Sequence, residues 1–516
     1  MKIVNRVIAA AFFGMMLVIV TTVVFTFDAT DFYSKRSFLL PQGAMMAMGA
    51  LGLTLIGVLA ERDKGEKAHW LLCGLFWLAI FAVQAFSSYC AYFFTDWDPR
   101  IVFASAYSIS GYGVYWDLDY FRLNPNNAFL TLVFSAVLKV FRWVVGGEPG
   151  EDRCLIVLIA AQCVVNTLAG ALTQWAAWKL TGRRSWARAA AVVYVLLIGL
   201  SPWVRMTYSD SMGLIFPVAI LCVYLKARES EKKTAYSMAI GGLTGIAYLI
   251  KPQTAIITIA LTLVSGARLL SDGETRRALK CAAVMAATIF LAVLPGANAI
   301  IHASPIVTDK ARQKTMLHYA MMGLNPEHNG EYFEDDTKLI DQYPPGERET
   351  IQLEVIRQRT SAMGFDGYMK LMHKKLLANY ADGSFGWGNE GYFFNVWVAE
   401  KNAASPVIRD WIDSRYGSRW PYLQAFFQSV WLGILTMAML SPIAFHKSGR
   451  GTAHRDALAV MMLALIGVTL FEMIFEARAR YLFTYVPIDL LVGLMGLQAA
   501  LKYAKESRKE KAIREN

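Results

Sequence analysis

Long apolar stretches dominate this 516-residue chain, and most of them have the length of a membrane-spanning helix. A hydrocarbon core about 30 Å thick is crossed by a helix of about 20 residues. Hydrophobic residues make up 55% of the chain, more than in a soluble domain. The sequence therefore predicts an all-α polytopic membrane protein with about 12 transmembrane helices and additional interfacial helices. The apolar stretches lie at residues 7–27, 38–60, 70–91, 128–145, 154–178, 187–203, 212–225, 234–250, 254–269, 281–300, 422–445, 457–475 and 482–501.

One long segment, residues 299–420, interrupts these stretches with polar, charged and aromatic side chains. It is short of the alternating apolar pattern of strands, and Ile351 to Met363 carry a helical pattern. We therefore expect a small, mainly helical cap on one face of the membrane. Such a segment indicates a protein that acts at the membrane surface as well as across it.

The positive charge of the chain, +11 in total, is concentrated in short loops and in the C-terminal tail. Cytoplasmic loops of membrane proteins carry such an excess of Lys and Arg. We therefore expect a multi-pass protein of the cell membrane with its C-terminus in the cytoplasm and the 299–420 segment on the extracytoplasmic side. The net positive charge is therefore no evidence for nucleic-acid binding, and we expect no nucleic-acid partner.

These features divide the chain into successive parts. Val7–Phe27 is too long for the apolar core of a cleavable signal and lacks a small-residue cleavage site, so it is expected to be an anchor. The six cysteines lie in or beside apolar stretches, without disulfide or zinc spacing. The predicted parts are two N-terminal helices (1–69), a catalytic membrane module (70–298) with an acidic outer loop (92–127), the cap (299–420), the C-terminal helices (421–501) and a basic tail (502–516).

Crossings counted from the two ends of the chain disagree by one between residues 100 and 200. One apolar stretch in that interval is therefore not a full span. We assign Ala128–Val145 to the membrane interface, because Lys139 and Arg142 interrupt it as in an amphipathic surface helix. A different assignment of the apolar stretches in residues 154–203 would make the two counts agree equally well.

Two carboxylates, Asp96 and Asp98, flank Trp97 just after the third apolar stretch, on the outer face in this topology. A carboxyl group held near an apolar wall has a raised pKa and accepts a proton from an acceptor hydroxyl. If both groups stay ionised, they suit a divalent cation instead. The alternative is a solvated loop with Trp97 in the interfacial aromatic belt.

Two amides, Asn126 and Asn127, end the polar run from Asp117 and lead into the stretch at 128. Asn126 is suited to cap that helix, and the free N–H groups there make an anion site. An ordinary helix start is the alternative. Tyr208 and Asp210 follow the end of another stretch. A lone acid at a helix N-terminus commonly serves as a cap, but the topology places these residues on the same outer face as Asp96 and Asp98.

Cationic side chains lie between apolar stretches on this face. A lysine in an apolar run costs at least about 2.5 kcal/mol unless it is paired or near the surface, so Lys251 is a candidate phosphate ligand or a snorkelling lysine. Arg478 and Arg480 suit bidentate phosphate binding. The alternative is a structural ion pair between Glu476 and Arg480, four residues apart on one helix face.

All of these side chains fall on one face of the membrane in the predicted topology. Acids that activate an acceptor, together with cations that hold an anionic leaving group, indicate a transferase with a phosphate-linked donor. Because the donor side faces lipid, a polyprenyl-phosphate carrier fits best. Tryptophans of the cap offer planes for sugar rings, or else belong to the interfacial belt; they are Trp387, Trp397, Trp411 and Trp420.

An ordered set of short motifs spans about residues 90–490. The motifs are Asp98-Pro99, Tyr120-Phe121, Pro125–Asn127, Tyr208–Asp210, Leu249–Gln253, Met321–Asn325, Lys374-Lys375, Asp382–Trp387 with Glu390-Gly391, and Glu476–Tyr481. With this set the chain resembles bacterial integral-membrane glycosyltransferases of the C-type fold. That superfamily includes protein O-mannosyltransferases, aminoarabinose transferases and the catalytic oligosaccharyltransferase subunit. Within it, the chain looks most similar to uncharacterised Gram-positive members.

The resemblance implies a glycosyltransferase that takes a sugar from a polyprenyl-phosphate donor, usually with inversion at the anomeric carbon. It implies that Asp98, or Asp96, is the catalytic base or orients the acceptor. Typical members have one helix before the acidic loop, whereas here two additional helices, at residues 7–27 and 38–60, precede it. This departure leaves the choice between these acids open. Members also differ in metal use, so a divalent cation is left open.

The remaining motif residues receive binding roles from the same resemblance. Those assigned to the donor and its lipid phosphate are Lys251, Arg478, Arg480, Asp210 and Tyr208. Those assigned to the acceptor or to sugar binding are Asn126, Asn127, Trp387 and Glu390. The expected partners are a lipid-linked sugar donor, membrane lipid, and an envelope glycan or protein as acceptor.

Other functions compete with transfer. A transporter or flippase of a lipid-linked saccharide should carry ionisable residues at mid-membrane in broken helices, whereas the charges here gather at one face. A non-catalytic scaffold in an envelope assembly, and a ligase or polymerase of whole glycans, are further alternatives. The sequence specifies neither the sugar nor the acceptor.

Overall fold

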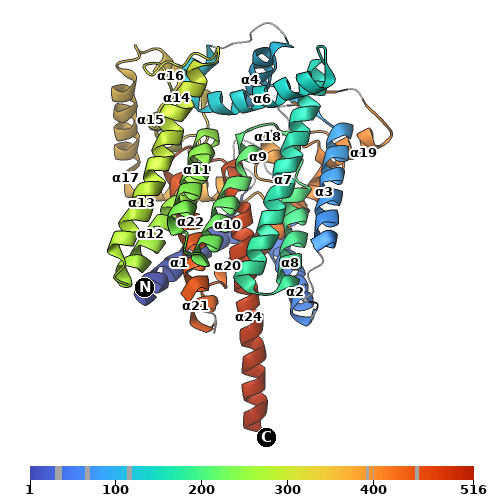
Figure 1. The fold of residues 1–516 in the computed structure, drawn as a ribbon, viewed down its shortest axis with the longest axis vertical. Helices are drawn as coiled ribbons and strands as arrows, with labels where there is room; N and C mark the ends of the chain where they lie inside the picture. Colours follow the sequence, from blue (N-terminus) through green and yellow to red (C-terminus); the bar gives the residue numbers. More distant parts are fainter. Residues whose placement is uncertain are drawn as a thin grey trace.

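The computed structural model describes residues 1–28, 38–63, 65, 70–112, 119–390, 394–398, 400–447 and 452–515. Helices make up most of this part of the chain (Figure 1). Asp117 and Gly391, which belong to the motifs above, lie outside the described residues.

Long apolar helices form a bundle. Within the described ranges, 11 helical stretches are long and apolar enough to cross a membrane. Their long helices are α1 (Lys2–Thr26), α2 (Gln42–Arg62), α3 (Trp70–Cys90), α6 (Ala128–Val145), α7 (Glu151–Thr181), α10 (Ile215–Arg228), α12 (Ile256–Ser271), α13 (Thr275–Leu291), α20 (Trp420–Met439), α22 (Thr452–Ile474) and α24 (Val486–Glu515). Helices α8 (Arg184–Tyr194) and α11 (Lys233–Ile250) run alongside them (Figure 1). The chain is an all-α polytopic membrane protein, as the sequence predicts.

Helix α6 lies across the bundle, whereas α7, which follows it, runs along the bundle (Figure 1). The length and hydropathy of α6 alone would allow it to cross a membrane. One face, with Leu130, Phe134 and Leu138, is buried, while Lys139 is exposed. An apolar stripe at this spacing is typical of an amphipathic helix. The arrangement agrees with the assignment of residues 128–145 to the interface.

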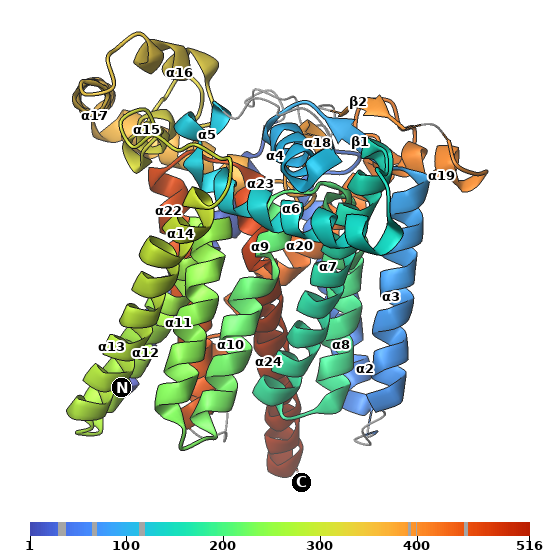
Figure 2. The same ribbon diagram turned by 45° about the horizontal axis from the view of Figure 1, so that its top comes forward.

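Both chain termini lie toward one end of the bundle, which we call the basal end, and α21 (Ile443–Lys447) also lies there (Figure 1). The opposite end, the cap end, carries the segment between α14 and α20 (Figure 2). Short elements gather at the cap end: α4 (Asp98–Tyr107), α5 (Tyr120–Leu123), α9 (Ser209–Gly213), α14 (Ala297–His302), α15 (Met316–Gly323), α16 (Glu334–Asp341), α18 (Trp387–Glu390), α19 (Ala404–Ile412) and α23 (Ala479–Leu482).

The cap is mainly helical, as expected. Its longest helix, α17 (Arg348–Tyr380), contains the predicted helical pattern and bends at Gly364. The φ of Gly364 is 59°, a left-handed value that glycine adopts without steric cost.

A two-stranded ribbon at the cap end was not predicted. Strand β1 (Phe93–Thr95) pairs antiparallel with β2 (Phe394–Trp397), with Phe93 opposite Trp397. The ribbon joins the acidic outer loop directly to the cap. It therefore fixes the position of the chain just before Asp98.

The N-terminal helices pack against the C-terminal part of the bundle. A Cβ built on Gly49 of α2 would lie 1.7 Å from the carbonyl oxygen of Ser429 in α20. A Cβ on Gly433 would lie 2.7 Å from the carbonyl carbon of Gly49. Small residues at such crossings allow helix backbones in membranes to approach closely. The two glycines thus tie α2 to α20.

Candidate active site

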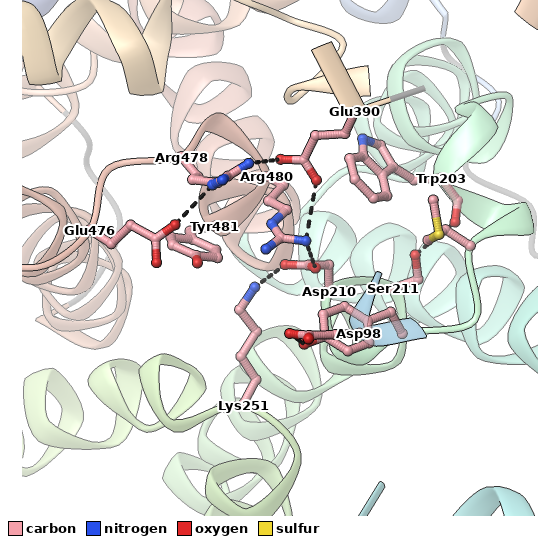
Figure 3. Close-up of polar contacts among 12 residues, drawn as sticks. Asp98, Trp203, Asp210, Ser211, Lys251, Glu390, Glu476, Arg478, Arg480 and Tyr481 are labelled. Carbon is pink, nitrogen blue, oxygen red and sulfur yellow. Dashed lines mark hydrogen bonds and ion pairs between the residues drawn. The ribbon is translucent and has the colours of Figure 1, made fainter. Parts of the chain in front are cut away.

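Acids and cations from distant parts of the chain meet at the cap end (Figure 3). Asp98 begins α4, Asp210 lies in α9, and Lys251 follows the last residue of α11. Glu390 ends α18, and Arg480 lies in the short helix α23. Each side chain comes from a helix end or a one-turn helix, so the site is built from the ends of helices and the short turns between them.

Asp210 and Lys251 form a buried ion pair. Asp210 is 1% exposed and its Oδ1 accepts from Lys251 Nζ. Burial lowers the pKa of Lys251, and the neighbouring carboxylate of Asp210 opposes that shift. The ammonium group also lies 4.8 Å from the ring centre of Tyr481. A buried charge requires such partners, and the pair fixes a cation next to Asp210.

Arg480 lies at the centre of the cluster. Its Nη1 is 3.2 Å from Oε2 of Glu390 and 3.9 Å from Oδ2 of Asp210. Its guanidinium carbon lies 4.3 Å from the ring centre of Trp97. Its buried Nε has no hydrogen-bond partner within the described part of the chain. An unsatisfied buried donor on a guanidinium is suited to an anionic ligand.

Glu390 connects the two arginines. Its Oε1 lies 3.0 Å from Arg478 Nη1, while Oε2 faces Arg480. Arg478 Nε also donates to Oε1 of Glu476 at 2.9 Å. Burial alone lowers the pKa of Arg478, but Glu390 and Glu476 outweigh it and hold that pKa above its usual value. Glu390 is 4% exposed, so it orients guanidinium groups instead of presenting a free carboxylate to a sugar.

The alternative of a structural ion pair between Glu476 and Arg480 is wrong. Helix α22 ends at Ile474, and Arg478 has extended backbone angles of −154° and 129°. Because residues 476 and 480 do not share a helix, their side chains do not follow the four-residue spacing. Glu476 pairs with Arg478 instead.

Asp98 accepts a hydrogen bond from the hydroxyl of Tyr208, at 3.1 Å from its Oδ2. Burial raises the pKa of Tyr208, and the carboxylate of Asp98 raises it further, so the phenol keeps its proton. Trp97 packs edge-on against Tyr208, with ring centres 5.4 Å apart. Asp98 is thereby held beside the ring that covers Arg480. Asp96, two residues earlier, is exposed.

The two predicted amides differ in their surroundings. Asn127 is buried and its Nδ2 donates to the hydroxyl of Tyr120 at 2.6 Å. Burial raises the pKa of Tyr120, and the nearby Asp98 adds to that shift. Asn127 therefore binds a tyrosine that is a neighbour of Asp98. Asn126 is exposed, and α6 begins without a side-chain cap. The predicted capping by Asn126 is therefore wrong.

Trp387 does not present a face to a sugar, contrary to its predicted role. It is fully buried, with its ring centre 5.3 Å from that of Trp203. Its Nε1 donates to the carbonyl oxygen of Ile412 at 2.8 Å. The turn before it places Phe385 and Gly386 at positive φ, 55° and 82°, which directs the ring inward. Trp387 therefore anchors α18, the helix that carries Glu390.

A buried lysine near the cluster had no predicted role. Lys375 of α17 is 0% exposed, and its Nζ donates to the carbonyl oxygens of Gly323 at 2.8 Å and Phe475 at 2.6 Å. Burial lowers the pKa of Lys375 to about 7. It fastens the cap to the end of α22, just before the Glu476 segment. A lysine pair within a motif was the sole sequence signal.

Two acids of the site, Asp210 and Glu390, face the side chains of lysine and arginine. Both oxygens of Asp210 point toward Lys251 or Arg480, and those of Glu390 point toward Arg478 and Arg480. Among the residues that the structure describes, no group of three or more His, Cys, Asp or Glu side chains is gathered to hold a metal ion. The carboxylates present thus fit ammonium and guanidinium partners.

Comparison with known proteins gives the following relationships. In fold, the chain is similar to the oligosaccharyltransferase AglB of Archaeoglobus fulgidus in complex with an inhibitory peptide and a dolichol-phosphate, at 13% identity and a TM-score of 0.41, covering 85% of this chain and 52% of that one. A second A. fulgidus oligosaccharyltransferase structure, with Zn and sulfate, matches at 15% identity and a TM-score of 0.29, covering 80% and 53%. The chain spans about half the length of these structures. No curated protein matches it in sequence.

A family model described as "Conserved hypothetical integral membrane protein" matches residues 1–501. Because this match covers nearly the whole chain, the protein belongs to that family of integral membrane proteins.

Proposed function

We propose that the chain is a membrane glycosyltransferase that moves a sugar from a polyprenyl-phosphate-linked donor to an envelope acceptor at the cap end. The observation that carries the proposal is the arrangement of Asp98 beside a buried cluster that contains Lys251 and Arg480 (Figure 3). A proton acceptor next to cations is what glycosyl transfer from a phosphate requires.

In this reaction Asp98 acts as the general base. Its carboxylate takes the proton of the acceptor hydroxyl while that oxygen bonds to the anomeric carbon. The bond between the anomeric carbon and the phosphate oxygen breaks, and its electron pair leaves with the lipid phosphate. A single displacement of this kind inverts the anomeric centre. Tyr208, which donates to Asp98, keeps the carboxylate oriented.

The leaving phosphate gains one negative charge, which the cations must stabilise. Arg480 offers a buried Nε without a partner in the described part of the chain, and Lys251 lies beside it on Asp210. Preorganised cations at the developing charge lower the barrier without reorganisation during the reaction. Glu390 holds the guanidinium groups of Arg478 and Arg480 in place for this role.

The proposed reaction takes place on the extracytoplasmic face. This assignment follows from the Lys and Arg excess in the loops at the basal end. At the cap end the donor phosphate would lie at headgroup level with its polyprenyl tail in the bilayer. The acceptor, an envelope glycan or protein, would approach from the cap.

The test compares the envelope glycans of a deletion strain with those of the parent strain by mass spectrometry. Variants of the gene are then expressed in the deletion strain. A general base contributes about 10²–10⁴-fold to the rate, so Asp98→Asn should reproduce the deletion. Asp96→Asn is the matched control, because Asp96 is exposed, and it should restore the parent pattern. Membrane levels of each variant are measured alongside. Parental glycans made by well-folded Asp98→Asn protein would contradict the proposal.

A transporter of lipid-linked saccharide predicts a different result. In proteoliposomes it would move substrate across the bilayer without forming a product. Transfer of sugar to an acceptor without net movement of the donor supports the enzyme.

A further inference from the structure

The cap contains a cavity that the proposed reaction does not use. Its volume is about 270 Å³, and it lies between the turn at residues 309–315, α16 and α17. Its lining includes Lys310, Arg312, Lys314, Thr315, His318 and Gln352. None of the charged residues of the candidate active site is among them.

The lining carries more positive than negative charge. Four cationic side chains face two carboxylates, those of Asp341 and Glu349. Arg348 pairs with Asp341 at 3.3 Å, and Arg312 lies 3.8 Å from the carboxylate of Asp119, outside the lining. The surplus favours an anionic occupant.

The inner wall of the cavity is polar and buried. His318 and Gln352 are 2% and 3% exposed. His318 Nδ1, Gln352 Oε1 and Thr315 Oγ1 have no hydrogen-bond partner within the described part of the chain. Leaving a buried polar atom without a partner costs about 1–3 kcal/mol, and a wall with three such atoms is suited to the hydroxyl groups of a ligand. Burial lowers the pKa of His318 to about 4, so the ring is neutral at physiological pH and has one donor and one acceptor nitrogen.

The cavity is connected to the acid of the active site through one short helix. The backbone N–H of Lys314 donates to the carbonyl oxygen of Leu123, the last residue of α5, at 2.8 Å. Tyr120, the first residue of α5, is a neighbour of Asp98. Figure 2 shows α5 between α15 and α4. One wall of the cavity is thus joined by a backbone hydrogen bond to the helix that carries this neighbour of Asp98.

We propose that this cavity binds an anionic sugar unit of the acceptor glycan. Lys310 and Lys314 contact the charged group of the sugar, a carboxylate or phosphate, while His318, Gln352 and Thr315 bind its hydroxyls. Ligand pockets for drug-sized molecules have volumes of about 300–1,000 Å³, so the smaller cavity accepts one sugar unit at a time. The assignment of the sugar to an acceptor rests on the proposed function, whereas its binding does not.

Binding is measured on purified full-length protein by isothermal titration with glucuronate, glucose 6-phosphate, glucose and inorganic phosphate. The two anionic sugars should bind at least about tenfold more tightly than glucose, because they keep charge-assisted hydrogen bonds. Lys310→Ala with Lys314→Ala should weaken their binding about tenfold. The matched control is Lys338→Ala on α16, whose lysine lies outside the cavity and pairs with Glu334, and it should bind like the parent.

Gln352→Leu separates the sugar from a simple anion. It removes an amide oxygen that has no partner in the described chain, so it should leave the thermal midpoint unchanged and weaken only the sugars. Equal binding of inorganic phosphate and glucose 6-phosphate, or of glucose and glucuronate, would overturn the inference. So would loss of binding upon addition of phosphatidylglycerol vesicles, since the site would then belong to lipid headgroups. Asp98→Asn should bind glucuronate normally, so a failure of transfer and a failure of the cavity are read separately.

Discussion

Among single residues, Glu390 determines how the arginines of the candidate site are held. Each of its oxygens faces a different guanidinium group, that of Arg478 at 3.0 Å and that of Arg480 at 3.2 Å. Charges taken out of water are stable only with partners of good geometry. One carboxylate therefore fixes the spacing of two cations, and its loss would leave both without a shared partner.

We predict that Glu390→Gln destabilises the protein and reduces transfer. Removing one partner of a buried ion pair costs about 3–5 kcal/mol, so the thermal midpoint of the purified protein should fall. Glu400→Gln is the control, because Glu400 is exposed and its partner Arg409 lies 3.9 Å away, and surface pairs contribute little. Equal thermal midpoints for the two variants would show that Glu390 does not hold the arginines.

At this scale the sequence indicated which residues belong to the site better than it indicated their partners. Asp98, Asp210, Lys251 and Arg480 were predicted from polar residues at the ends of apolar stretches, because such residues cannot enter lipid alone. Partner choice depends on local backbone direction. Glu476, which the sequence offered as an alternative partner for Arg480, pairs instead with Arg478, because helix α22 stops before it.

Among elements, the crossing of α2 with α20 shows how tightly the N-terminal helices are integrated. The backbones approach so closely at Gly49 and Gly433 that neither position has room for a Cβ. Gly52, on the same helix α2, has no heavy atom within 4 Å of an added Cβ. Gly49 and Gly52 lie on the same helix and differ in what surrounds them, so their substitutions can be compared directly.

We predict that Gly49→Ala separates α2 from α20 and lowers the thermal midpoint, because the added methyl group would overlap the backbone of Ser429. Gly52→Ala should be neutral or slightly stabilising, since alanine is favoured over glycine in helices by about 1 kcal/mol. Both are compared by fluorescence-detected size-exclusion chromatography after heating. A Gly49→Ala protein as stable as Gly52→Ala would contradict the observed crossing.

Helices were predictable from apolar length, but the ribbon was not. Strands of three and four residues, β1 and β2, are too short to show a two-residue period. Their pairing also joins segments about 300 residues apart, a distance over which a local pattern carries no information. The burial of Trp387 was unpredictable for the same reason: it packs against Trp203, which lies far away in the sequence.

For the whole molecule, the main prediction is its orientation. The chain ends at the basal end, and the cap lies at the opposite end of the bundle (Figure 1). The bundle itself does not distinguish the two sides of a membrane. The charge bias of the loops does, because positively charged loops are retained in the cytoplasm.

We therefore expect cysteines placed in the cap and in the tail to react differently with a membrane-impermeant maleimide. Lys338→Cys, on an exposed cap position, should be labelled in intact cells. Lys505→Cys, in the exposed tail, should be labelled only after the cells are permeabilised. The six native cysteines are buried or half-buried, and the unsubstituted protein measures their background. The reverse pattern would place the cap in the cytoplasm.

The wide separation of Asp98 and Arg480 along the chain has a consequence for biosynthesis. A ribosome delivers membrane helices in order from the N-terminus. Lys251, which pairs with Asp210, is made more than two hundred residues before α23. A nascent or truncated copy thus lacks the arginines that the proposed transfer needs. Chains that stop before α23 would therefore be inactive in the proposed transfer.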